Sequence, residues 1–343
     1  MNTNNEKKGL LKKQVEFKPF HYPQLLEYRK AIKSTPWHAD EYDYAKDIQD
    51  FKVHLTENGR QVSKRSMLGV AQVESASVKH FWGKVHDIFP RPEVAMVGYT
   101  FAENEIVHSE SYSMILDLLG FNDEFEEVLK TDVIGGRVTY LEKYLRGSGD
   151  NVNEFNALKV ALFTLFVENV SLFGQFLILR SFKEANQQLQ AIDNVVQATM
   201  KDELVHAQFG IELLKILKEE NPEWFNEDFN SKIQRACLKA YDAEANIVDW
   251  IFEGGDLDFI SAHDVKEFLK RRFNESLEEL NIERVFKDLD LESFERTKWM
   301  DRDILAYTRN DFFNNKSVNY SRKSVTTKQV RKGIDKFKKE FGL

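Results

Sequence analysis

The stretch FAENEIVHSESY, residues 101–112, decides the fold, because its polar residues are spaced for one face of a helix. Glu105 and His108 stand three residues apart in a run that is otherwise largely apolar on that face. Residues at i and i+3 share a helical face, so both side chains can reach one point in space. Phe101 and Tyr112 continue the same face at spacings of four. The pattern predicts a buried helix that carries a Glu-x-x-His pair.

A second copy of the pair appears in KDELVHAQF, residues 201–209, as Glu203 and His206. Two further glutamates stand in apolar surroundings: Glu168 between LFTLFV and NVSLFGQF, and Glu74 in MLGVAQVESASV. The four motifs follow in the order Glu, Glu-x-x-His, Glu, Glu-x-x-His, each on its own predicted helix.

Burying an ionised carboxylate without a partner costs several kcal/mol or more, so this set needs a compensating cation. One glutamate from each of two helices and Glu-x-x-His from each of two others is the pattern already known for di-iron and di-manganese carboxylate proteins. Carboxylate and imidazole ligands favour iron or manganese over zinc-thiolate or copper(I) sites. Taken singly, a Glu-x-x-His pair reads as a solvated polar pair, and a lone glutamate as the partner of a lysine or arginine. The joint order predicts a dinuclear metal site.

Composition narrows the class of protein. Of 343 residues, 42% are hydrophobic and 30% charged, which fits a globular chain with a substantial core. The net charge of −8 argues against a nucleic-acid binder. Cys237 is the only cysteine, which excludes an internal disulfide or a cysteine-ligated cluster and favours the cytoplasm. No secretory signal is expected at the N-terminus. The apolar run at 157–179 carries Lys159, Glu168, Asn169 and Gln175, so we expect a buried core helix and no membrane span.

The distribution of proline and the apolar periodicity predict an all-α fold, because no proline lies between residues 93 and 221 and alternating runs are nearly absent. An internal IGG at 134–136 is a candidate kink. Helices are expected at 61–89, 93–119, 122–145, 153–183, 186–219, 224–254, 262–273 and 292–311. The predicted organisation is an N-terminal arm with short helices (1–50), one helical domain (51–315) and a mobile C-terminal tail (316–343).

At this point the residues resemble a known family. The string EIVHSESY is similar to the Glu-x-x-His-Ser-x-Ser-Tyr signature of the radical-generating small (beta) subunit of class I ribonucleotide reductase, and KDELVH resembles its Asp-Glu-x-x-His motif. The resemblance runs from TPWHADE to DFFNNKSVNYSRK. It implies a ferritin-like helical bundle with additional helices, and a site in which an oxygen-derived oxidant oxidises a di-manganese, di-iron or mixed manganese–iron centre.

The resemblance also assigns roles to residues. It implies that Glu74, Glu105 and His108 bind one metal and that Glu168, Glu203 and His206 bind the other, with some carboxylates bridging. Tyr112 matches the radical tyrosine and Trp37 the tryptophan near the start of the electron path. Asp202 matches the aspartate that links this tryptophan to His108, and Tyr320 the tail tyrosine that passes the radical on.

Two positions depart from the family pattern. The first ligand is Glu74, where the commonest members have aspartate; glutamate is similar to branches that use manganese, one of which replaces the radical tyrosine by phenylalanine. Because Tyr112 is kept, either Tyr112 or the metal pair holds the oxidising equivalent. The C-terminal peptide KQVRKGIDKFKKEFGL is basic, whereas family tails are often acidic. Its apolar residues still form one helical stripe: Val330, Ile334, Phe337 and Phe341.

The resemblance implies a homodimer that works with the large (alpha) subunit of the reductase, docked through the tail, and leaves a flavoprotein activator open. Cys237 alone cannot supply the reducing cysteine pair that ribonucleotide reduction needs, which agrees with a separate large subunit. The first alternative is a ferritin-like manganese–iron oxidase that binds a fatty-acid-like ligand; it would share the six ligands but would not need Trp37, Asp202 and Tyr320 as a set. The second is a metal-storage or scaffold protein, which would not need Tyr112.

Overall fold

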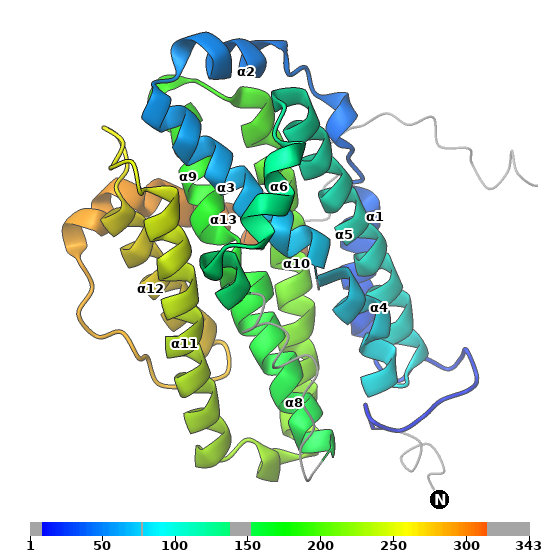
Figure 1. Ribbon diagram of the computed structural model, residues 1–343. Coiled ribbons are helices and arrows are strands. Elements are labelled where there is room, and N and C mark those ends of the chain that lie inside the picture. Colours follow the sequence, from blue (N-terminus) through cyan, green and yellow to red (C-terminus); the bar gives the residue numbers. More distant parts are fainter. Residues whose placement is uncertain (1–8, 77, 138–151, 314–343) are drawn as a thin grey trace, which may run out of the picture. The chain divides into compact units, whose positions relative to one another are not determined.

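A computed structural model of the chain describes residues 9–76, 78–137 and 152–313, and these residues are largely helical (Figure 1). Within those ranges no β-strand forms, and one isolated bridge joins Leu257 and Ile260. The predicted all-α class is confirmed. The chain divides into a large unit, Met1–Ala306, and a second unit, Tyr307–Leu343, of which only the end of the last helix is described.

The α-helices are α1 (Leu26–Ser34), α2 (Ala45–Gln49), α3 (Glu57–Ala76), α4 (Val78–Ile88), α5 (Pro92–Leu119), α6 (Asn122–Leu129), α8 (Val152–Leu162), α9 (Phe173–Asn186), α10 (Gln190–Glu220), α11 (Glu227–Ile251), α12 (Ala262–Glu278) and α13 (Leu291–Phe313). In the described residues, two further elements are π-helices: η3 (Asp50–His54) and η4 (Phe163–Ser171). Short 3-10 turns are η1 (Pro23–Leu25), η2 (Ala39–Glu41) and η5 (Pro222–Trp224).

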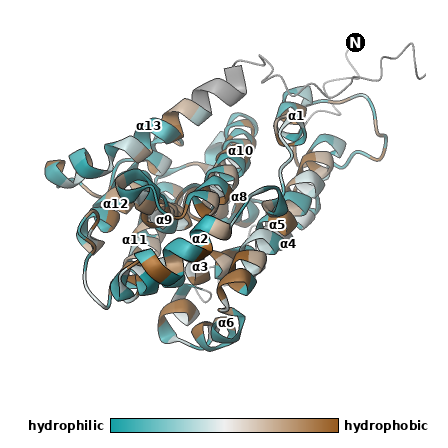
Figure 2. Ribbon diagram, turned by 90° about the horizontal axis from the view of Figure 1, so that it is seen from above, coloured by the Kyte–Doolittle hydropathy of each residue, from teal (hydrophilic) through white to brown (hydrophobic). Residues whose placement is uncertain are grey.

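Four helical elements enclose the core of the large unit: α3, α5, α10 and the continuous run formed by α8, η4 and α9 (Figure 1). Helix α3 packs on α5 and on α9, α10 packs on α5, and α10 also packs on η4 and α9, so the four close around a common interior. In Figure 2 many helices carry both hydrophilic and hydrophobic residues, as expected of helices that bury one face. The run from η4 into α9 differs, because every residue of η4 and residues 173–182 of α9 are buried.

Local sequence fixes the ends and the close approaches of these helices. Helix α5 begins at Pro92, whose missing N–H is not needed in the first turn, and is capped after Leu119 by Gly120, which adopts the left-handed φ of 80°. At Gly98 a Cβ would lie 2.5 Å from the Trp82 carbonyl oxygen, so only glycine lets α5 approach α4 this closely. At Gly210 a Cβ would collide with the side chain of Thr164, and this glycine allows α10 to lie directly against η4.

The structure corrects several predicted helix boundaries. The helix expected at 61–89 is two helices, α3 and α4, and the one expected at 122–145 ends at Leu129. Residues 132–137 are helical again, so the break falls at Lys130–Thr131, before the glycines taken as a kink. The helix expected at 153–183 is interrupted by the π-helix η4. Every residue of η4 is buried, so its apolar pattern has no polar face from which a change of helical pitch could be recognised.

The apolar run singled out in the sequence lies in a helical stretch, Asn153–Asn186, that is long and apolar enough to cross a membrane by length and composition. All of its most apolar window is buried inside the fold. This is the arrangement of a core helix.

Candidate metal centre

The six residues expected to bind metal meet at one place in the interior, and each is at most 1% exposed. They come from the four elements that enclose the core. Helix α3 contributes one of them, η4 one, and α5 and α10 two each. In chain order they are Glu74, Glu105, His108, Glu168, Glu203 and His206.

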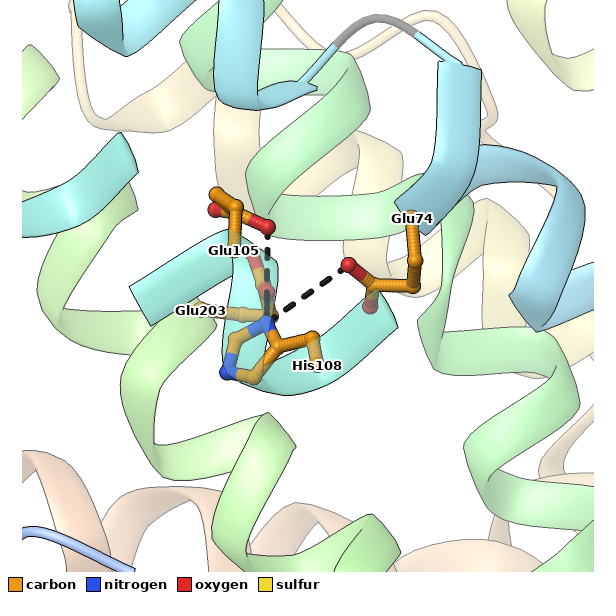
Figure 3. A group of neighbouring side chains, drawn as sticks. All are labelled: Glu74, Glu105, His108 and Glu203. Atoms are coloured by element: carbon orange, nitrogen blue, oxygen red, sulfur yellow. Dashed lines mark ion pairs between the residues drawn. The ribbon is translucent and has the colours of Figure 1, made fainter. Parts of the chain in front are cut away.

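The six side chains form two overlapping groups, in each of which one ligand atom per residue lies within 4.8 Å of the others. The first group, drawn in Figure 3, contains Glu74, Glu105, His108 and Glu203, whose polar ends point toward one another. The second contains Glu105, Glu168, Glu203 and His206. Because Glu105 and Glu203 belong to both groups, the geometry offers two adjacent cation sites with two shared carboxylates. Each site keeps one histidine and one glutamate of its own.

Both histidines turn Nδ1 toward the carboxylates. His108 Nδ1 lies 3.1 Å from Glu203 Oε1 and 3.4 Å from Glu105 Oε2. His206 Nδ1 lies 2.8 Å from Glu105 Oε1 and 3.4 Å from Glu168 Oε2. The two inward nitrogens and the glutamate oxygens thus surround the same small volume.

The donor atoms of this cluster fit a metal pair. Apart from their contacts with one another, both carboxylate oxygens of Glu74, Glu105 and Glu203 and the two histidine Nδ1 atoms are buried without a hydrogen-bond partner. A buried polar atom left unpaired costs about 1–3 kcal/mol, and more when it is charged. Oxygen and imidazole donors in this number suit two divalent ions such as manganese or iron. The cluster is therefore built to be completed by cations.

Burial and mutual charge shift the protonation of the cluster when no metal is bound. Burial raises the pKa values of Glu74 and Glu168 well above the usual carboxyl range. For the histidines, burial opposes the charged form, but the neighbouring carboxylates outweigh it and raise the pKa values of His108 and His206 well above their usual value. Without metal, protons thus take the place of cations.

Thermal stability should therefore depend on metal and pH together. In the metal-free protein the pKa values of the buried glutamates are raised, so the free energy of unfolding falls as pH rises above the ordinary carboxyl pKa of 4.5. The protonated histidines stabilise the fold until the pH passes their raised pKa values. The metal-bound fold needs these groups deprotonated. We expect the rise in Tm on adding Mn(II) to be larger at about pH 8 than at about pH 6. Differential scanning fluorimetry with Mn(II) or with EDTA measures both; an equal rise at the two pH values would contradict this protonation scheme.

A hydrogen-bonded chain leads outward from His108. Its Nε2–H donates to Asp202 Oδ2 at 3.2 Å, and the same oxygen accepts from Trp37 Nε1 at 2.8 Å. The rings of Trp37 and His108 are stacked, with centroids 5.8 Å apart. The structure thus brings together the three residues that the sequence linked by resemblance.

Two further contacts to the ligands were not foreseen from the sequence. Asn104 accepts from His206 Nε2 at 3.0 Å and donates to Asp202 Oδ2 at 3.0 Å, so it couples the two histidines through Asp202. Trp82 Nε1 donates to Glu168 Oε1 at 2.8 Å. Asn104 carried a signal, since it is a polar residue one helical turn before His108 on the same face. Trp82 carried none, because a tryptophan in VKHFWGKV reads as core.

Tyr112 lies on α5 one turn beyond His108 and is fully buried. Its hydroxyl is 3.5 Å from Thr199 Oγ1, which is a long hydrogen bond. Burial raises the pKa of the phenol, so the neutral, protonated form is strongly favoured. Tyr320 and the apolar stripe of the tail lie outside the described residues.

The family model described as ribonucleotide reductase, small chain, matches residues 14–292. This chain belongs to that family. The match spans all six residues of the cluster, together with Trp37, Asp202 and Tyr112, so the resemblance drawn from the motifs is confirmed. As a ribonucleotide reductase small chain it is a subunit of an oxidoreductase. Small chains of this family carry a dinuclear manganese or iron centre, and the buried cluster offers glutamate and histidine donors that fit such a centre.

Sequence similarity to other small chains extends over most of this protein. A probable ribonucleoside-diphosphate reductase small subunit of Invertebrate iridescent virus 3 is 24% identical over 336 residues, covering 92% of this chain and 87% of the viral protein. A ribonucleoside-diphosphate reductase subunit beta of Chlamydia pneumoniae is 22% identical and covers 92% of this chain and 93% of its own length.

Solved structures confirm the ferritin-like fold of these small chains. A putative class I ribonucleotide reductase from Bacillus halodurans has a TM-score of 0.73 at 20% identity, over 82% of this chain and 99% of the other. The dimanganese(II) NrdF protein of Streptococcus sanguinis has a TM-score of 0.69 at 16% identity, over 83% of this chain and 99% of the other.

Proposed function

We propose that this small chain generates and stores, at the six-residue cluster, the oxidising equivalent with which a separate large subunit reduces ribonucleotides to deoxyribonucleotides. The observation that carries the proposal is the hydrogen-bonded chain from the cluster through His108 and Asp202 to Trp37. A cluster that only stored metal, or that oxidised a bound lipid, would not need a tryptophan joined in this way to a metal ligand.

In this proposal the ligands have distinct tasks. Glu74 and His108 would hold one ion and Glu168 and His206 the other, while Glu105 and Glu203, which belong to both groups of ligand atoms, would contribute to both. When bound, the pair of manganese or iron ions supplies one-electron oxidising power after reaction with an oxygen-derived oxidant. Trp82 orients Glu168 through its Nε1–H.

The remaining residues move electrons and protons. Asp202 Oδ2 accepts hydrogen bonds from both Trp37 and His108, so a proton released by an oxidised Trp37 has an acceptor 2.8 Å away. Tyr112 is the candidate holder of the oxidising equivalent, since burial keeps water away from its ring and its hydroxyl is only weakly hydrogen-bonded. We assign the last step out of this chain to Tyr320 in the tail.

The partners follow from the same chemistry. Cys237 is the only cysteine and is buried, so the substrate cysteines must belong to the large subunit. We propose that the C-terminal tail 316–343 docks on that subunit through its apolar stripe, and that this chain forms a homodimer. A flavoprotein that delivers the oxidant is a further possible partner. A buried free cysteine suits the reducing cytoplasm, where we place the protein.

Electron paramagnetic resonance tests the proposal. The protein is loaded separately with Fe(II) and Mn(II), exposed to oxygen or superoxide, and compared with Tyr112→Phe. We expect a tyrosyl signal that disappears in the variant. As a control, Tyr99→Phe changes a 55% exposed tyrosine of the same helix and should keep the signal.

A mixed-valent metal signal that persists in Tyr112→Phe would move the oxidising equivalent to the metals and overturn the role of Tyr112. A signal that leads to no nucleotide reduction with a cognate large subunit, together with a lipid extracted from the core, would instead support the ligand-binding oxidase.

A further inference from the structure

The ligand Glu168 is carried by the π-helix η4, an unusual element to find at the centre of a core. A π turn is wider than an α turn and interrupts the i→i−4 hydrogen-bond ladder, so carbonyl groups at its end need other partners. A shift of one residue in that ladder turns the side chains beyond it by about 100°. The direction of Glu168 therefore depends on whatever keeps this segment from relaxing to an α-helix.

One partner is Arg272 of α12, whose side chain is 6% exposed. Its Nη2 donates to the backbone oxygen of Asn169 at 2.7 Å and to Asn169 Oδ1 at 2.6 Å. The guanidinium lies over the ring of Phe173, at 4.5 Å from its centroid, and Asn169 Nδ2 donates to Ser276 Oγ at 2.7 Å. Asn169 follows Glu168 directly, so these contacts hold the residue next to the ligand.

The balance of charge around Arg272 shows how much these contacts matter. Its carboxylate partner is Glu275, at 3.3 Å and with a side chain that is 50% exposed. A buried guanidinium costs several kcal/mol unless it is paired and hydrogen-bonded. The two oxygens of Asn169 supply the buried part of that compensation. Arg272 and the end of η4 thus stabilise each other.

A second partner is Arg137, which is fully buried. Its Nη2 donates to the backbone oxygen of Ser171 at 3.0 Å, at the last residue of η4, and its Nη1 donates to the backbone oxygen of Gly69 at 2.9 Å. Its charge is balanced by Glu244, which accepts from Nε at 2.9 Å. Gly69 belongs to α3, the helix that carries Glu74. Arg137 therefore joins the backbones of the two elements that each supply a single glutamate to the cluster.

We propose that Arg272 and Arg137 are positioning residues for the metal centre: by binding the carbonyl oxygens of Asn169 and Ser171 they hold the π-helical pitch of η4 and so aim Glu168 into the cluster. This inference rests on the proposed dinuclear site. Neither arginine is expected to touch a metal ion. Loss of Arg272 should weaken binding of the ion that Glu168 helps to hold more than binding of the ion that Glu74 helps to hold.

The test compares Arg272→Gln with Arg271→Gln, its neighbour on α12. Arg271 is comparably buried, but it donates hydrogen bonds to Thr297 and Asp301 of α13. We expect one of the two Mn(II) dissociation constants to rise about 10- to 100-fold in Arg272→Gln, as for other residues that orient metal ligands, while the other changes less. Both constants should stay unchanged in Arg271→Gln. Mn(II) titration followed by electron paramagnetic resonance gives both constants for each protein.

A second readout needs no metal. Hydrogen exchange of the metal-free variants should accelerate at the amides of residues 163–172 in Arg272→Gln and not in Arg271→Gln, while the amides of α10 remain protected in both. Arg272→Lys, which keeps the charge but not the fork of donors, should show the same local change if the fold of Arg272→Gln is too unstable to measure.

The outcomes separate the two proposals. Wild-type protein that fails to bind two ions would count against the dinuclear site itself. Wild-type protein that binds two ions, with unchanged constants and unchanged exchange in the Arg272 variants, would overturn the positioning role of Arg272 without counting against the dinuclear site.

Discussion

Replacing Glu203 with alanine is expected to remove both metal ions from the protein, whereas replacing Glu74 or Glu168 is expected to remove only one. The reason is that Glu203 belongs to both groups of ligand atoms, while Glu74 and Glu168 each belong to one. Removing Glu203 leaves each site three of its four ligands and takes away a charge shared by both cations. Metal content per chain, measured by inductively coupled plasma mass spectrometry after gel filtration, distinguishes the two results.

The matched control for this experiment is Glu219→Ala, which changes an exposed glutamate of the same helix, α10, and should keep both ions. Circular dichroism of each variant shows whether the helices remain. If Glu203→Ala retained as much metal as Glu168→Ala, the shared position of Glu203 would have no part in binding.

Trp37→Phe is expected to abolish ribonucleotide reduction by the complex of small and large subunits while leaving metal content and the resonance signal of the isolated small chain unchanged. Phenylalanine keeps an aromatic ring beside His108 but has no N–H to donate to Asp202, so the hydrogen-bonded chain ends at the carboxylate. The phenyl ring of phenylalanine is also much harder to oxidise than the indole ring of tryptophan. Because Trp37 binds no metal, the loss should appear only in turnover with the large subunit.

Trp224→Phe serves as the control, since it makes the same change in the short turn η5 after α10. Asp202→Asn adds a second comparison: the amide can still orient Trp37, but it cannot take up a proton as a carboxylate does. Full turnover in Trp37→Phe, at normal assembly of the two subunits, would show that the equivalent leaves by another route.

The sequence predicted the six residues of the buried cluster because ionisable groups that stand in apolar surroundings can be recognised in a chain. Glu168 stands among phenylalanines and leucines, and two Glu-x-x-His pairs repeat about a hundred residues apart, so the cost of burying them implied a cation before any geometry was known. The same argument did not reveal that Glu105 and Glu203 are shared. Sharing depends on how α5 and α10 face each other, and residue spacing within one helix carries no information about that.

Other features could not be predicted from the sequence, because they too depend on tertiary packing. The π-helix η4 was read as ordinary helix because all of its residues are buried, and a change of pitch shows in sequence only where a polar face drifts. The break at Lys130–Thr131 was placed a few residues late because glycines are the stronger local signal, yet Gly135 keeps its helical hydrogen bond to Thr131 at 2.8 Å. Arg137 and Arg272 were not noted, since surface arginines are far more common than buried ones.

The contact between Gly210 and Thr164 constrains how this centre can change over evolutionary time. Gly210 lies one turn after His206, and Thr164 one turn before Glu168, so the pair sets the spacing of two ligand-bearing backbones. A single substitution that adds a methyl group at 210 meets the threonine side chain at once. A lineage that enlarges residue 210 must first have reduced residue 164, which makes the order of the two substitutions, and not only their identity, part of the protein's history.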